Sequence, residues 1–214
     1  MIPGTSAGAP PQEPASGGGI VRPDKELYFL LIAMAARTRA DCLGRRVGAV
    51  IVRDGRVVST GYNGTPFGMR NCSSGGCLRC QRREQDPAMR SGAYDVCLCV
   101  HAEQNALLTT ARFGGQLLGS SITSTLQPCF GCLKELLQAG VSEVYFLHPW
   151  DPAEAYGDSA LAAQYQNLVG RFAIFTQVGT PSLDNADLFS SFMASPDERA
   201  GAGKGEAKAE EENT

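Results

Sequence analysis

Residues 97–108 read "CLCVHAEQNALL", which places two cysteines, a histidine and a glutamate directly before a helical pattern. Taken alone, the stretch has a simple structural interpretation. His101 caps the helix, and Glu103 is a first-turn carboxylate that the helix dipole favours. The other interpretation is chemical, because histidine and cysteine bind metals and glutamate carries protons. Residues further along the chain decide between the two.

A second motif, "TLQPCFGC" at residues 125–132, joins the end of a predicted strand to the start of a predicted helix. The spacing of Cys129 and Cys132 lets two thiolates bind one ion at the helix start. A Cys-x-x-Cys pair is also typical of redox sites, but the preceding segment does not suit a thioredoxin-like fold. With His101, the pair makes three zinc ligands. Three protein ligands leave the fourth tetrahedral position for water, as in catalytic zinc sites.

The two motifs together match a known signature, H-x-E followed by P-C-x-x-C, which describes zinc-dependent nucleobase deaminases in general. In that signature the glutamate is not a zinc ligand and serves as general acid and base. The sequence therefore predicts a catalytic zinc held by His101, Cys129 and Cys132, with Glu103 moving protons. The alternative is a purely structural zinc at the same residues.

Composition sets the domain organisation. The chain has 214 residues, of which 43% are apolar, enough for one domain with a full core. Residues 1–22 consist mainly of Gly, Pro, Ala and Ser, and residues 195–214 lack apolar periodicity, so both tails are predicted to be disordered. One zinc domain is expected over residues 23–194, with a cysteine-rich insertion at about 69–98. Neither tail resembles a signal peptide or a membrane span, which predicts a cytoplasmic protein without membrane contact.

The charge distribution bears on the partner. The two tails hold 7 of the 22 acidic and 4 of the 19 basic residues, so 15 of each remain in the predicted domain. A near-neutral domain is a poor match for a nucleic-acid polymer. Residues 37–56 nevertheless form a local positive patch, which suits a small phosphate. Its arginines are Arg37, Arg39, Arg45, Arg46, Arg53 and Arg56, against Asp41 and Asp54.

Apolar periodicity predicts an α/β fold, a mixed sheet of about five strands between helices. A helix with Asp24 as its N-cap is expected over residues 25–40, and Asp54-Gly55 is expected to turn a hairpin. The predicted strands are 47–52, 56–62, 120–126, 143–149 and 171–177, and the further predicted helices are 101–113, 129–140 and 159–170.

Residues 25 to about 177 resemble the deoxycytidylate (dCMP) deaminase family of the cytidine deaminase superfamily, most closely its fungal type. Three segments carry the likeness in the family's order: "CLGRRVGAVIVRDGRVVSTGYNGTP", "NCSSGGCLRC" and "CLCVHAEQNALL". The resemblance implies a cytidine-deaminase-like three-layer sandwich and a catalytic zinc. It also implies hydrolysis of dCMP to dUMP and ammonia, which supplies dUMP for thymidylate synthesis. The family also implies control by dCTP and dTTP. It further implies assembly into a homo-oligomer, often a hexamer.

The same resemblance suggests roles for further residues. The backbone N–H of Ala102 would bind the pyrimidine carbonyl, and Asn63 in "GYNGTP" would contact the sugar. The loop with Arg45 and Arg46 would lie near the nucleotide, and Arg112 near a subunit or effector contact. The residues themselves leave alternatives open, since Ala102 also suits tight packing and Asn63 also suits a turn.

Six further cysteines need an explanation, because a cytoplasmic chain does not use them as disulfides. Cys77 and Cys80 form a second Cys-x-x-Cys in a segment that has no apolar face of its own. We therefore predict a structural zinc on Cys72, Cys77 and Cys80, with Cys42, Cys97 or Cys99 as fourth ligand. Related phage enzymes place cysteines at the positions of Cys42 and Cys72. A set of unrelated buried thiols is the alternative.

Three other functions fit parts of the sequence. A tRNA adenosine deaminase shares the zinc residues but needs charge for a polymer, which this domain lacks. A free cytidine deaminase would need no phosphate site. An inactive, zinc-stabilised regulatory module would have no use for Glu103.

Overall fold

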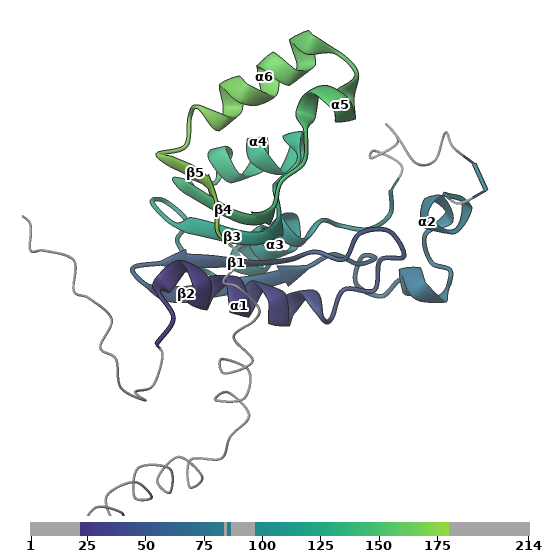
Figure 1. Cartoon of the computed structure of the whole chain (residues 1–214). Coiled ribbons are helices and arrows are strands. Elements are labelled where there is room, and N and C mark those ends of the chain that lie inside the picture. The colour runs from purple at the N-terminus through teal and green to yellow at the C-terminus, as the bar shows by residue number, and fades with distance from the viewer. Residues whose placement is uncertain (1–21, 84, 87–96, 180–214) are drawn as a thin grey trace, which may run out of the picture. The chain divides into compact units, whose positions relative to one another are not determined.

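The fold is built on a five-stranded mixed sheet, seen in a computed structural model that describes residues 22–83, 85–86 and 97–179 (Figure 1). The strand order is β2-β1-β3-β4-β5. β1 pairs antiparallel with β2 and β3, whereas β3, β4 and β5 run parallel. The predicted α/β fold with a mixed five-stranded sheet is confirmed. The strands are β1 (Gly48–Arg53), β2 (Arg56–Tyr62), β3 (Ser121–Leu126), β4 (Glu143–His148) and β5 (Ile174–Gln177).

Helices cover both faces of the sheet, so it forms the middle of three layers. Val50 and Val52 of β1 pack on the side of α1, whereas Ala49 and Ile51 join a core with α3, α4 and α6. Strand side chains alternate between faces, and here both alternating sets are buried. The four helices are α1 (Lys25–Arg37), α3 (Ala102–Phe113), α4 (Phe130–Gln138) and α6 (Ser159–Val169).

Local sequence signals account for the element boundaries. Oδ1 of Asp24 accepts a hydrogen bond of 2.8 Å from Leu27 N–H at the start of α1, which makes it the N-cap that the sequence predicted. Asp54 and Gly55 both have positive φ, 51° and 71°, as a tight hairpin turn between β1 and β2 requires. Helix α3 ends at Phe113 with Gly114 as its C-cap, which agrees with the predicted helix over residues 101–113.

Two glycines let helices approach the sheet closely. A Cβ atom on Gly61 of β2 would overlap the carbonyl oxygen of Ala102 in α3, and one on Gly48 of β1 would overlap the carbonyl oxygen of Ala33 in α1. Any larger residue at position 61 would therefore push the start of α3 outward.

The cysteine-rich insertion differs from its prediction. It forms the short helices η1 (Cys72–Ser74) and α2 (Leu78–Arg82), and it has a small buried core, whereas the sequence predicted a segment without an apolar face of its own. That core consists of cysteine side chains rather than of an apolar face. Residues 84 and 87–96 of the insertion lie outside the described residues. One further short helix, α5 (Pro152–Tyr156), precedes α6.

The domain boundaries stay predictions. The compact unit begins at Pro23, but residues 1–21 and the predicted boundary at 194 with its acidic tail fall outside the described residues. Within the described parts of the chain, the helices are too short or too polar for a bilayer crossing.

Candidate zinc centre and active site

The three predicted zinc ligands meet where two helices begin. His101 is the N-cap of α3, Cys129 is the N-cap of α4, and Cys132 lies in the first turn of α4. His101 Nδ1 lies 3.4 Å from each Sγ, and the two Sγ atoms are 3.6 Å apart. A tetrahedral zinc with bonds of about 2.0–2.3 Å holds such ligand atoms about 3.5–3.8 Å apart. The three side chains therefore fit one zinc ion, with Nδ1 as the histidine ligand.

The electrostatics of these side chains favour a cation. The pKa of Cys129 is lowered to about 4, first by its hydrogen bond with Cys132 and then by His101. The pKa of His101 is raised to about 9, mainly by its hydrogen bond to Cys129. A thiolate is thus present among these ligands at neutral pH, at a helix N-terminus that stabilises negative charge.

Glu103 lies beside this ligand set. Its side chain is only 4% exposed; Oε1 accepts a hydrogen bond of 3.0 Å from Ser124 Oγ, and Oε2 lies 3.6 Å from Cys132 Sγ. Burial is the largest cause that raises the pKa of Glu103, followed by the negative charge of Cys129. A buried carboxyl group with a raised pKa holds a proton more readily than a free glutamate does, which suits a group that transfers protons.

Ser124 was missed by the sequence analysis. It lies on β3 on the same face as Ile122, and it is fully buried against Glu103. The signal was present, because a serine at a core-facing position of a strand must find a hydrogen-bond partner.

The segment that carries Cys129 is fixed by three side chains that sequence reasoning also missed. Tyr165 of α6 is fully buried; its hydroxyl donates to Pro128 O at 2.8 Å and accepts from Gln127 Nε2 at 3.0 Å. Trp150 Nε1 donates to Gln127 O at 2.8 Å. These contacts come from elements far along the chain, so no local pattern announces them.

Asn63 holds a loop in place. Its Oδ1 accepts from Val47 N at 2.8 Å, and its Nδ2 donates to Arg45 O at 2.7 Å. Both ends of the side-chain amide thus bind the loop that contains Arg45 and Arg46. This supports a structural role for Asn63, and its contact with the sugar stays a prediction. Ala102 is the first residue of α3, where the backbone N–H has no acceptor inside the helix.

A groove of about 550 Å³ lies next to this loop, at the carboxyl ends of β3 and β4. Arg45, Arg46 and His148 line it together with Thr125 and Cys42. Ligands of α/β proteins commonly bind at this edge of a sheet. The predicted phosphate arginines therefore line this groove, whose lining does not include His101, Glu103, Cys129 or Cys132.

Arg112 lies apart from the groove, near the exposed end of α3. Its guanidinium stacks over Phe67 and Phe113, 5.8 and 5.5 Å from the ring centroids. Phe67 is 96% exposed and Phe113 is 76% exposed, so a cationic and aromatic patch faces outward.

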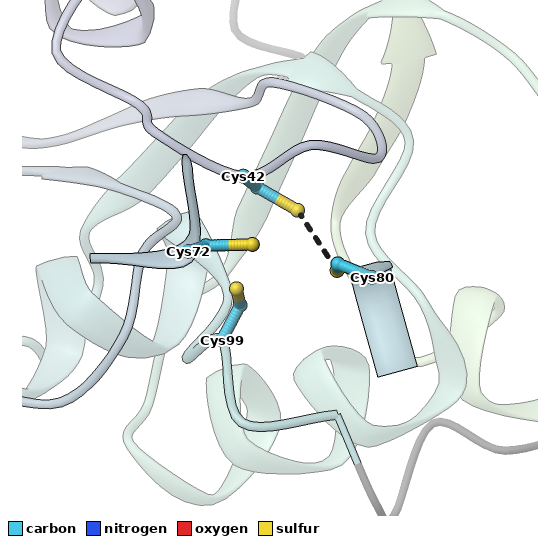
Figure 2. Close-up of side chains that lie close together, drawn as sticks. All are labelled: Cys42, Cys72, Cys80 and Cys99. Carbon is cyan, nitrogen blue, oxygen red and sulfur yellow. Dashed lines mark hydrogen bonds between the residues drawn. The ribbon is translucent and has the colours of Figure 1, made fainter. Parts of the chain in front are cut away.

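The six other cysteines, among them the three predicted ligands of the second zinc, form two overlapping groups. Cys42, Cys72, Cys80 and Cys99 have their sulfur atoms within 4.8 Å of one another and point toward a common centre (Figure 2). A second group of the same kind consists of Cys77, Cys80, Cys97 and Cys99. The predicted trio is thus divided, because Cys72 and Cys77 lie in different groups. Cys72 and Cys77 are five residues apart, and spacing alone does not tell which way each side chain turns.

Comparison with known proteins gives the family. Residues 23–148 match the profile of the cytidine and deoxycytidylate deaminase zinc-binding region, which covers more than half of the chain. The chain belongs to the cytidine and deoxycytidylate deaminase family. This family domain is zinc-binding, so zinc is the metal that the His-Cys-Cys set fits.

Individual family members agree with this assignment. The deoxycytidylate deaminase of Saccharomyces cerevisiae is 42% identical over 129 residues, which cover 59% of this chain and 38% of that protein. The deoxycytidylate deaminase of Mycobacterium phage D29 is 40% identical over 129 residues, 58% of this chain and 95% of the phage protein. The chain thus spans well under half of the yeast relative and nearly all of the phage relative.

A solved structure supports the fold. The dCMP deaminase from cyanophage S-TIM5 superposes with a TM-score of 0.52 at 24% identity, over 74% of this chain and 99% of that chain, in a complex with dCMP and dUMP. Its likeness confirms the cytidine-deaminase-like architecture of the family in this chain.

Proposed function

We propose that this protein is a zinc-dependent hydrolase that converts dCMP and water into dUMP and ammonia. The observation that carries the proposal is the Glu103 carboxylate, buried within 3.6 Å of a zinc-ligand sulfur and held there by Ser124. A carboxylate buried without a salt bridge is costly, and a proton-carrying role explains why it is kept there. The names of the yeast and phage D29 relatives support dCMP as the substrate.

The chemistry divides between the metal and the chain. Zinc bound by His101, Cys129 and Cys132 would lower the pKa of a water molecule toward about 7, which makes a nucleophile available at neutral pH. Glu103 would take a proton from the attacking water and pass it to ring N3 while the water oxygen bonds to C4. It would then take the proton of the new C4 hydroxyl and give it to the amino group, so that the C4–N bond breaks, the C4 carbonyl forms and ammonia departs. One carboxylate thus serves every proton transfer in the reaction.

Other residues would bind the nucleotide. The N–H of Ala102, which has no acceptor within α3, is suited to the pyrimidine carbonyl, and Asn63 holds the loop that borders the groove. Arg45 and Arg46 supply positive charge to that groove for the 5′-phosphate. Supply of dUMP for thymidylate synthesis follows as the metabolic role.

Ammonia release tests the proposal when dCMP is compared with deoxycytidine, dCTP, CMP and an RNA hairpin. We expect turnover with dCMP and far less with the other four. Preference for deoxycytidine would indicate a nucleoside deaminase, and preference for the hairpin a tRNA adenosine deaminase. Zinc-loaded protein without turnover of any substrate would indicate an inactive regulatory module.

Regulation and assembly belong to the same proposal. We expect dCTP and dTTP as effectors and a homo-oligomer, possibly a hexamer, for which the Arg112, Phe67 and Phe113 patch offers exposed aromatic surface. Eight free thiols suit a reducing compartment such as the cytoplasm.

A further inference from the structure

The six cysteines outside the active site come together from three separate parts of the chain. Cys42 precedes β1, the second part belongs to η1 and α2, and the third directly precedes α3. Five of the six side chains are buried, and Cys97 is half-buried. The members are Cys42, Cys72, Cys77, Cys80, Cys97 and Cys99.

The two groups of four share two sulfur atoms. Cys80 and Cys99 belong to both groups, Cys42 and Cys72 belong only to the first, and Cys77 and Cys97 only to the second. Two tetrahedra that share one edge have six corners, of which two are common to both. The six sulfur atoms have the same connectivity.

We propose that these six thiolates bind two zinc ions in a single cluster, with the sulfur atoms of Cys80 and Cys99 bridging the ions. Each zinc would have four sulfur ligands, two shared and two of its own. This differs from one structural zinc with four cysteines, which would leave two buried thiols beside it without a function.

Distances agree with metal binding and not with disulfides. Cys42 Sγ and Cys80 Sγ are 3.8 Å apart. A disulfide needs about 2.05 Å, whereas two sulfur ligands of a tetrahedral zinc with bonds of about 2.3 Å lie about 3.8 Å apart. The spacing is that of two ligands on one ion.

Hydrogen-bond donors face three of the six sulfur atoms. Leu43 N–H donates to Cys72 Sγ at 3.4 Å, and Gly44 N–H donates to Cys42 Sγ at 3.3 Å. Arg79 forms a side-chain hydrogen bond with Cys97. Six thiolates with two zinc ions have a formal charge of −2, the same as four thiolates with one zinc, so the second ion adds no net charge to be offset.

Packing alone does not account for this cluster. Outside the six cysteines, the only partly buried hydrophobic residue in contact with the cluster, among the described residues, is Leu98. Three chain segments with so little apolar contact gain few kcal/mol from burial. Two ions with four thiolate bonds each would supply the missing cross-links.

Metal counting on the full-length protein tests the proposal without reference to turnover. Native mass spectrometry of the wild type should find about three zinc ions per chain, one catalytic and two in the cluster. Cys132→Ser, which removes a catalytic ligand, should leave about two. One remaining zinc in that variant would overturn the two-ion cluster.

A second variant addresses the terminal ligands of the second group. The double variant with Cys77→Ser and Cys97→Ser should bind one zinc ion fewer than the wild type. A single zinc on Cys42, Cys72, Cys80 and Cys99 predicts no loss. If this variant does not fold, the wild type loaded with ¹¹³Cd²⁺ still decides the matter. Two ¹¹³Cd resonances coupled through shared sulfurs are expected, and uncoupled resonances would contradict bridging.

Discussion

Glu103 is the residue at which a structural and a catalytic role differ most. Glu103→Gln keeps the size of the side chain and removes its ability to take a proton. Because general acid–base catalysis contributes roughly 10² to 10⁴ in rate, and one group serves several transfers, dCMP turnover should fall by at least about 10³. Zinc content and the circular dichroism spectrum should stay at wild-type values, which distinguishes lost chemistry from lost folding.

Glu26 offers a matched control, because it occupies the same second position of α1 that Glu103 occupies in α3. Glu26 is exposed, so Glu26→Gln removes only a helix-dipole interaction, under about 1 kcal/mol, and should leave turnover unchanged. A Glu103→Gln protein that binds zinc and works within tenfold of the wild type would rule out the proton-carrying role. Loss of zinc and activity together is expected instead for His101→Ala and Cys129→Ser.

Substitution of Arg45 or Arg46 tests the predicted contact with the phosphate. A charge-assisted hydrogen bond to phosphate is worth about 1.5–3 kcal/mol, so its loss should raise the KM for dCMP roughly 10- to 100-fold. We expect this for Arg45→Gln, Arg46→Gln or both, with deoxycytidine turnover little changed. Arg56→Gln, at an exposed position of the β-hairpin, serves as the control. Equal losses with the nucleotide and the nucleoside would argue against a phosphate contact.

Among the elements, the contact of β2 with α3 positions His101 and Glu103. A methyl group at Gly61 would overlap the Ala102 carbonyl and displace the start of α3, which carries His101 and Glu103. Gly61→Ala should cost roughly 1–3 kcal/mol of unfolding free energy, as overpacking does, and should lower dCMP turnover as well. Urea unfolding and ammonia release measure the two effects.

Gly170→Ala is the matched control for that change. Gly170 ends α6 with a φ of −66°, and a Cβ there would come no closer than 3.5 Å to its neighbours. Its substitution should leave stability and turnover nearly unchanged. If Gly61→Ala behaved like Gly170→Ala, the close approach of strand and helix would have no role in the site.

For the whole molecule, Arg112 and its aromatic neighbours provide a test of assembly and control. Arg112→Ala removes the cation over two exposed rings, and such surface is typical of contacts between proteins. We expect weaker responses of dCMP turnover to dCTP and dTTP, and a smaller particle by sedimentation, before basal turnover falls. Arg171→Ala, another exposed arginine, should change none of these. Unaltered effector responses in the Arg112 variant would remove this patch from regulation.

The sequence by itself determined the main elements and predicted the residues of the site. Alternation and helical periodicity gave the five strands and the main helices, because local spacing sets which side chains share a face. His101, Glu103, Cys129 and Cys132 were predicted as site residues for a similar reason, and the structure brings their side chains together. Each ligand lies at or near a helix start, and few residue types bind zinc.

Only the tertiary structure decided how distant segments meet. Ser124 reaches Glu103 because β3 passes beneath α3, and Tyr165 reaches Pro128 from α6. The division of Cys72 and Cys77 between two groups depends on the turn from η1 into α2 and on where Cys42 and Cys99 arrive. Such contacts join residues that are far apart in the sequence and form only when the chain between them closes into a loop. Residue spacing along the chain does not encode them.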